Sequence, residues 1–340
     1  MGVEGLWKLL PAAEDRVSLF KFTSEQAFNA SFRPYILGID ASLWTYHAQA
    51  VSGTGENAEI ELIFHRCCRL LSMPVAPLFV FDGPDQPKKR RSEKRSKAKS
   101  TRERTNECYY LNGIRGIVSS FGFELLTAPG EAEATLAQLN SAGIINAILS
   151  DDVDCFLFGT KTVLRSITVN NSPYCEYVRV YSADILKQHG FSQEELVFIA
   201  LLSGGDYDPT FQGLSDCGIT TASQLRFLEF GKALKIFETT DCELEETLCE
   251  WRVQLRKELE TNKSAVLSQK NCKAANNLTD DFPRPETIRA YFHPSVLNDV
   301  ELEHLSQSLW KNELKLERIS GACEMYFMWS SKAGIIKTFE

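Results

Sequence analysis

Carboxylate residues in the middle of the chain have the types and spacing of a divalent-metal site. The stretch 128–159, APGEAEATLAQLNSAGIINAILSDDVDCFLFG, places Glu131 and Glu133 at the start of an amphipathic helix, and the apolar strand that follows ends in Asp152 and Asp154. Carboxylates this close repel one another unless cations lie between them. Oxygen ligands suit Mg²⁺ or Mn²⁺, and a pair of such ions is a common means of cutting phosphodiesters. The stretch therefore predicts a metal-dependent nuclease.

The two glutamates can share one site only in a particular helix register. Residues i and i+2 of a helix point about 200° apart. Both can face the same site if Glu131 is the cap residue and Glu133 lies in the first turn, which the preceding Pro129-Gly130 favours. Carboxylates at that end also gain from the positive end of the helix dipole.

Two further acids follow other predicted strands. The apolar segments 35–39 and 77–81 lead directly into Asp40 and Asp82. Short apolar strands that alternate with helices predict an α/β fold with a mostly parallel central sheet, flanked by helices and buried on both faces. Such sheets bind ligands at the carboxyl ends of their strands. One edge should therefore gather Asp40, Asp82 and the Asp152/Asp154 pair. The other expected strands are 123–127 and 145–149, and the expected helices are 5–10, 42–50, 59–71 and 109–121.

The net charge of −8 is unevenly distributed along the chain. Residues 88–104 hold ten Lys/Arg and two Glu, a local charge of +8, so the remainder carries −16. This segment, the basic arm, can be a catalytic element, a solvated loop or a nuclear import signal, and we expect a nuclear protein. No run of about eighteen apolar residues predicts a membrane span, and the ten cysteines lack the CxxC pairs of a zinc site.

The second half of the chain is mainly helical in pattern. Ser192 and Glu195 form a capping box at the start of a helix that Gly204-Gly205 ends. The segment 213–225 then predicts two turns and a new helix. Residues 261–286 are polar and are expected to be a linker, whereas 287–340 should be a helical segment, with a strand near 324–329, at the start of a further module.

Five motifs resemble those of the XPG/flap-endonuclease superfamily, in order, over at least residues 1–240. After the opening MGVEGLWKLL they are IDASLW at 39–44, VFDGP at 80–84, APGEAEA at 128–134, SDDVDCFLFG at 150–159 and LLSGGDY at 201–207. The resemblance implies a PIN-like XPG nuclease core over 1–190, with its N and I regions and a basic arch at about 85–108. It also implies a helix–two-turn–helix DNA-binding region over 191–260.

Within the superfamily the sequence is most similar to the eukaryotic Holliday-junction resolvases, particularly a fungal form. The stretches DASLWTYHAQAV and LRSITVNNSP carry this likeness, and only 48 residues separate Asp82 from Glu131, too few for the long capped arch of flap endonucleases. A sliding-clamp motif is also missing from the sequence.

The resemblance implies a role for particular residues. It implies hydrolysis with two Mg²⁺ ions, which Mn²⁺ can replace, to 5′-phosphate and 3′-hydroxyl ends. Lys89 and Arg95 would contact the scissile phosphate, as parts of a DNA-binding set that also includes Gly2, Tyr46, Lys88, Arg90 and Arg91. Tyr46 would stack on a base near the cut, although a helix residue packed into the core has the same pattern. The implied metal ligands are Asp40, Asp82, Glu131, Glu133, Asp152, Asp154 and Asp206.

The segment 213–222 resembles the turns that grip duplex backbone through amides and a bound K⁺, with Gly213 and Gly218 as backbone contacts. The sequence departs from the family here, since Asp216 replaces a glycine and Ile219 replaces a phosphate-facing lysine. Asp can adopt a left-handed turn, but its charge would weaken binding to phosphate. Either Asp216 points away from the DNA or the grip is looser than in relatives.

Three functions remain open from the sequence. The first is an endonuclease that acts on 5′-flaps, replication forks and four-way junctions, monomeric in solution and paired on a junction. The second is a flap endonuclease or 5′-exonuclease without junction resolution. The third is a non-catalytic scaffold that binds DNA junctions. None of the implied metal acids is replaced, which argues against the third.

Overall fold

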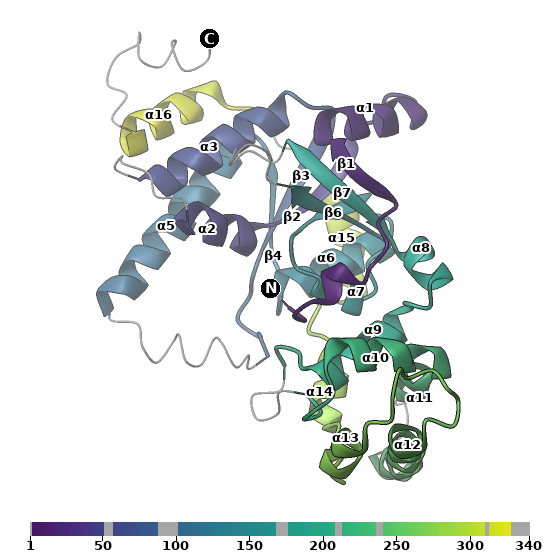
Figure 1. Cartoon of the computed structure of the whole chain (residues 1–340). Coiled ribbons are helices and arrows are strands. Elements are labelled where there is room, and N and C mark those ends of the chain that lie inside the picture. The colour runs from purple at the N-terminus through teal and green to yellow at the C-terminus, as the bar shows by residue number, and fades with distance from the viewer. Residues whose placement is uncertain are drawn as a thin grey trace.

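In the part of the chain that the structure describes, seven strands form a single mixed sheet at the centre (Figure 1). The structure is a computed structural model that describes residues 2–50, 57–87, 101–167, 176–207, 213–235, 241–309 and 313–327. The strand order is β1-β7-β6-β5-β2-β3-β4, in which β2 to β6 run parallel and β7 is antiparallel to both β6 and β1. The strands are β1 Glu14–Ser18, β2 Tyr35–Asp40, β3 Val75–Phe81, β4 Glu124–Thr127, β5 Ala147–Leu149, β6 Thr162–Ile167 and β7 Tyr177–Ser182.

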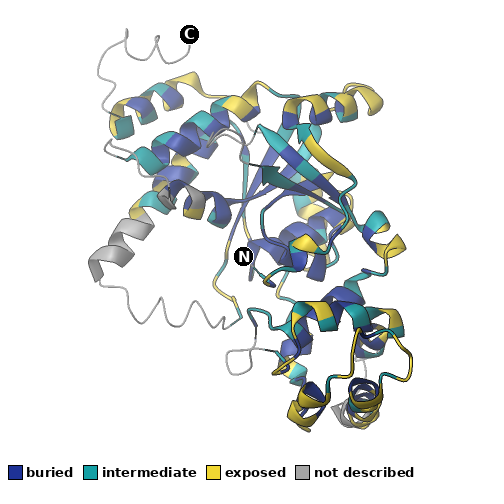
Figure 2. Cartoon of the chain, in the orientation of Figure 1, coloured by how far each residue is buried: buried dark blue, intermediate teal, exposed yellow. Residues whose placement is uncertain are grey.

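Helices cover both faces of this sheet, as the sequence predicts for a mostly parallel sheet. Successive residues of β3 point to opposite faces, so Leu78 and Val80 join one core whereas Phe79 and Phe81 join the other. Helices α1 Leu19–Asn29, α2 Ala41–Ala50, α3 Ala58–Leu71, α5 Thr101–Ser120 and α16 Leu316–Phe327 contribute to the second core. The first core includes η1 Leu6–Lys8, α6 Ala132–Ser141, α7 Asp154–Leu157, α8 Ala183–Gln188 and, at its margin, α15 Asp299–Ser308. Figure 2 shows the buried strands between these layers.

The first core continues into a helical region below the sheet (Figure 1). Its central helix, α9, is buried along almost its entire length. The region consists of α9 Gln193–Ser203, α10 Ile219–Leu225, η2 Arg226–Leu228, α11 Phe230–Lys235, α12 Asp241–Thr261, α13 Cys272–Asn277 and α14 Pro285–Phe292. The division into domains at residues 190 and 260 stays a prediction.

Two local expectations need correction, and two elements were not expected. Residues 261–286 are not a plain linker, since they contain α13 and bury Ala274, Ala275 and Leu278. The strand expected near 324–329 is wrong for 324–327, which end α16, because Ile319 and Cys323 pack this helix against the core. The elements β1 and α1 were not predicted from the sequence. The strand β1 is mostly exposed and therefore lacks an apolar run.

Candidate active site

Asp40 lies at the centre of the acidic edge. It ends β2, whose neighbours on either side are β5 and β3. Its Oδ1 accepts hydrogen bonds from the backbone N–H groups of Ser42 (2.9 Å) and Leu43 (3.1 Å), and the residue is 2% exposed. Burial raises the pKa of Asp40 to about 7, with further contributions from Asp82 and Asp152, the acids that follow the two neighbouring strands. The strand order therefore brings three acids from distant parts of the sequence into electrostatic contact.

Asp82 joins the ends of two helices to this edge. It follows β3 directly and is exposed. Its Oδ2 accepts a hydrogen bond from the Ser42 hydroxyl (2.7 Å), and its Oδ1 accepts one from the Ala132 backbone N–H (2.9 Å). Since Ser42 lies in the first turn of α2 and Ala132 begins α6, this one carboxylate fixes both helix starts against the sheet.

The two glutamates take the register that the sequence predicts. Glu131 is the N-cap residue of α6 and Glu133 lies in its first turn. Both are buried, at 5% and 6% exposed. A side chain at Gly130 would press on the Ser295 carbonyl at 2.9 Å, so this turn needs glycine for close backbone approach.

Asp152 and Asp154 follow β5 and are almost fully buried. Asp152 Oδ1 accepts a hydrogen bond from the Asp154 N–H at 3.1 Å, and Asp154 Oδ1 accepts one from the Val3 N–H at 3.3 Å. Gly2 packs so closely on this pair that a Cβ would overlap both Oδ1 atoms. The N-terminal residues are therefore part of the candidate site. In contrast, Asp151 turns away from this pair and accepts a hydrogen bond from the Ser166 N–H.

Asp206 and the following Tyr207 connect the helical region to the acidic edge of the sheet. Asp206 is half-buried just beyond α9, and it is one of four acids near enough to raise the pKa of Tyr291 further after burial itself. Tyr207 is 5% exposed, and its hydroxyl donates a hydrogen bond to Glu131 Oε2. Tyr207 was not predicted as a site residue, although it directly follows Asp206 in the LLSGGDY motif.

The chemistry of these residues fits a hard divalent cation. The buried carboxylates are hard to keep ionised together, as the raised pKa of Asp40 shows, and a cation would remove that penalty. Carboxylate oxygens are also the ligands that Mg²⁺ prefers. Among the described residues, no three His, Cys, Asp or Glu side chains already surround one metal-sized point. Three of the acids, Asp82, Glu131 and Asp154, accept hydrogen bonds from protein groups, and carboxylates that bind metals are commonly oriented by such bonds.

The proposed DNA-contact residues lie in several places. Tyr46 on α2 is 46% exposed, so its ring is not packed into the core and can meet a ligand. A hollow beside Glu131 is bounded by Asp85 and by His293 at the end of α14. Part of the predicted set lies outside the described residues, namely Lys88, Lys89, Arg90, Arg91 and Arg95.

The two glycines of the 213–218 turn differ in their surroundings. Gly213 has a φ of +77°, and a Cβ there would overlap backbone atoms of Leu202 and Gly204, so only glycine fits. Gly218 is the N-cap residue of α10, and a Cβ there would meet no described atom within 4 Å. The backbone at Gly218 is therefore open to a ligand. Asp216 adopts the left-handed conformation expected of it, with a φ of 64°.

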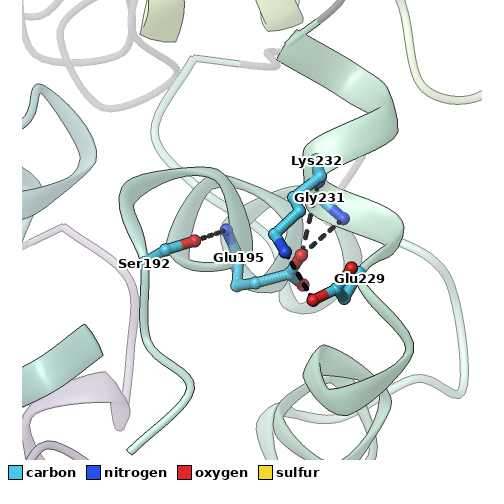
Figure 3. Close-up of polar contacts among 5 residues, drawn as sticks. All are labelled: Ser192, Glu195, Glu229, Gly231 and Lys232. Atoms are coloured by element: carbon cyan, nitrogen blue, oxygen red, sulfur yellow. Dashed lines mark hydrogen bonds and ion pairs between the residues drawn. The ribbon is translucent and has the colours of Figure 1, made fainter. Parts of the chain in front are cut away.

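Glu195 has a different role from the predicted one. The Ser192 hydroxyl accepts a hydrogen bond from the Glu195 N–H, as in a capping box. The Glu195 carboxylate does not complete the box, because its Oε1 accepts hydrogen bonds from the N–H groups of Gly231 (3.0 Å) and Lys232 (3.3 Å) on α11 (Figure 3). Its Oε2 is buried without a hydrogen-bond partner among the described residues. This acid therefore joins α9 to α11 instead of capping its own helix.

Comparison with known proteins identifies the class to which this fold and edge belong. Residues 1–103 match the XPG N-terminal domain, and residues 122–206 match the XPG I-region. A solved structure of the eukaryotic junction-resolving enzyme GEN-1 with potassium is 32% identical and has a TM-score of 0.80, covering 99% of this chain and 76% of that one. The chain belongs to the XPG/flap-endonuclease superfamily of structure-specific nucleases.

More particular likenesses point to two kinds of relative. The Flap endonuclease GEN homolog 1 proteins of Mus musculus and Homo sapiens are each 29% identical over 69% of this chain, and each alignment spans 26% of the relative. The Holliday junction-resolving enzyme GEN1 in complex with product DNA and Mg²⁺ is 31% identical, with a TM-score of 0.79, over 98% of this chain and 75% of that one. Homo sapiens Flap endonuclease 1 is 28% identical over 63% of both sequences.

Proposed function

We propose that this protein is a metal-dependent, structure-specific DNA endonuclease that cuts 5′-flaps and four-way junctions. The observation that carries the proposal is the acidic edge, where the buried Asp40 lies between the acids that follow β3 and β5. Membership of the XPG superfamily and the similarity to junction-resolving enzymes support it.

The protein's own side chains account for ion binding and orientation. The residues proposed to hold two Mg²⁺ or Mn²⁺ ions are Asp40, Asp82, Glu131, Glu133, Asp152, Asp154 and Asp206. When bound, such a pair activates a water molecule and stabilises the leaving 3′-oxygen, which gives 5′-phosphate and 3′-hydroxyl ends. Tyr207 holds Glu131 in place, and Gly2 lets the N-terminus lie against the acids without a steric clash.

The DNA surface is proposed to extend from the acids in two directions. The exposed Tyr46 ring is placed on α2 to stack on a base near the cut. On the other side, α9, the 213–218 turn and α10 form a helix–two-turn–helix that contacts duplex backbone at Gly213 and Gly218, with K⁺ as a bound ion. A relative's structure with potassium supports that ion. The basic arm supplies Lys89 and Arg95 to the scissile phosphate.

Two further proposals concern assembly and location. We place the protein in the nucleus, on account of its basic arm and the DNA substrate. It is a monomer in solution, and two copies assemble on a four-way junction, because resolution requires two coordinated cuts. Among the described residues, no helix is long and apolar enough to cross a membrane.

Cleavage assays test this proposal directly. An intact four-way junction and a single 5′-flap, both end-labelled, are incubated with the protein with and without Mg²⁺. Paired symmetric nicks in the junction support resolution, whereas cutting of the flap alone would reduce the function to a flap endonuclease. Binding to both DNAs without any Mg²⁺-dependent cutting would contradict the catalytic proposal and leave a DNA-binding scaffold.

A further inference from the structure

The turn proposed to grip DNA is held by a segment that lies outside the helix–two-turn–helix itself. Residues 262–277, named here the basic strap, lead from α12 through α13. The strap is fixed to α10 by a pair of hydrogen bonds between the side-chain amide of Gln224 and Ser268, at 2.6 and 3.2 Å. It is fixed to α12 by the Asn271 N–H, which donates to the Leu259 carbonyl at 2.8 Å. These hydrogen bonds fix the strap against α10 and α12.

Two asparagines of the strap bind the turn at the point where its sequence departs from the family. The Asn271 side-chain amide donates to the Asp216 carbonyl at 2.9 Å. The Asn277 amide donates to Asp216 Oδ2 at 2.8 Å and to the Ser215 carbonyl at 3.3 Å. The carboxylate of Asp216 is therefore turned toward α13, where it accepts a hydrogen bond from the Asn277 side chain.

The strap also carries positive charge in an otherwise acidic protein. It contains Lys263, Lys270 and Lys273 and no acidic residue, although the whole chain has a net charge of −8. All three lysines are exposed, and none forms an ion pair with a described residue. Figure 1 places α13 beside α12 in the same helical region as the turn. Three uncompensated cations are therefore carried by the segment that contacts the turn.

We propose that the 213–218 turn and the basic strap form one composite surface for the phosphate backbone of duplex DNA. The strap lysines supply the charge that the turn lacks at Asp216 and Ile219, and Asn277 shields the charge that the turn adds. The open backbone at Gly218 and the strap lysines would contact the same duplex arm. This inference rests on the proposed function, and it identifies where the protein holds the uncut part of its substrate.

Salt-dependent binding tests the lysines. A fluorescent 5′-flap DNA is titrated by anisotropy in buffer with EDTA, which prevents cleavage, over 50–200 mM KCl. Each lost phosphate contact lowers the slope of log affinity against log salt by about 0.9. The triple variant Lys263→Ala, Lys270→Ala, Lys273→Ala is expected to lose between about one and three units of slope and to bind about tenfold more weakly.

A matched triple variant separates the strap from the general effect of charge. Lys21→Ala, Lys161→Ala, Lys187→Ala makes the same change in net charge at exposed positions outside the strap, and its slope should stay near that of the wild type. Equal slopes in all three proteins, or equal losses in both variants, would overturn the inference. A wild type that does not bind flapped DNA would instead contradict the proposed function.

A second pair of variants tests the shielding of Asp216. Asn277→Ala removes the amide that solvates the Asp216 carboxylate and should weaken DNA binding several-fold. Asp216→Asn in the same chain removes the charge and should restore most of the affinity. If Asn277→Ala lowers the midpoint of thermal unfolding and the second change restores no affinity, Asn277 merely supports the fold, and the shielding part of the proposal is wrong.

Discussion

The sheet edge and the composite surface of turn and strap both gather charged side chains, but the charges are mostly buried at the edge and exposed at the surface. At the edge, the carboxylates of Asp40, Asp152 and Asp154 are buried and their positions follow from where strands end. At the turn, the charges of Asp216 and the strap lysines are exposed and their positions follow from side-chain hydrogen bonds between loops. Buried charges interact strongly, so a single substitution among them has a large effect. Exposed charges are screened by salt, so each of them contributes a small amount to binding. Changes at the edge should therefore abolish function, and changes at the surface should weaken it in steps.

The largest effect is expected from Asp152→Asn. The amide keeps the shape of the carboxylate but removes a charge next to Asp40 and a proposed metal ligand, so the single-turnover rate of flap cleavage in Mg²⁺ should fall by about a thousandfold or more. The control is Asp151→Asn, because the neighbouring Asp151 carboxylate turns to the Ser166 N–H instead. Similar rates for both variants would show that the edge is not the catalytic site.

Glu195→Gln tests the buried acid that joins α9 to α11. Burial raises the pKa of Glu195 to about 7, with smaller contributions from Glu229 and Glu194. The folded protein therefore holds this proton more tightly than the unfolded chain, so the acid stabilises the fold most below pH 4.5 and this contribution is lost as the pH rises through about 7. It should amount to about 3 kcal/mol of unfolding free energy, since one pKa unit corresponds to about 1.4 kcal/mol.

The measurement is urea unfolding of both proteins at several pH values between 5 and 8. Glutamine keeps an oxygen that can accept the bonds from Gly231 and Lys232 but does not titrate. The difference in stability between wild type and variant should shift in favour of the variant as the pH rises. A difference that stays constant from pH 5 to 8 would contradict the assignment.

Tyr207→Phe is expected to have a moderate effect at the edge. The change keeps the ring, which packs against Phe158 and Tyr291, but removes the hydroxyl that orients Glu131. Loss of such an outer contact typically lowers metal affinity about 10- to 100-fold. Calorimetric titration with Mn²⁺ measures this without cleavage. Tyr35→Phe, at the other end of β2 from Asp40, is the matched control and should bind Mn²⁺ like the wild type.

The smallest effect is expected from Tyr46→Leu. This variant tests whether an exposed aromatic ring, like the exposed charges of the composite surface, makes a small contribution to DNA binding. The ring is 46% exposed, so its loss should change the free energy of unfolding by less than about 0.5 kcal/mol. Loss of stacking should weaken binding of flapped DNA by about 1 kcal/mol, roughly fivefold. A large loss of stability with unchanged DNA affinity would show that Tyr46 serves the core.

The sequence predicted the candidate site better than it predicted the edges of the fold. The parallel strands β2, β3 and β5 carry apolar runs that end on acids, so their type and their common edge follow from local pattern. The register of Glu131 and Glu133 followed from Pro129-Gly130 and helix geometry. The strand β1 was missed because an exposed strand lacks an apolar run. The strand predicted at 324–327 was wrong because a short apolar segment is compatible with either a strand or a helix.

What the sequence determined by itself was the set of acids and the strands that carry them, since the order of motifs needs no knowledge of distant contacts. Tertiary structure alone decided the partners. It placed Tyr207 on Glu131, moved Glu195 from its own helix cap to α11, and turned Asp216 toward Asn277. These contacts join residues from 36 to 76 positions apart, and at such separations only the packed chain can specify which donor meets which acceptor.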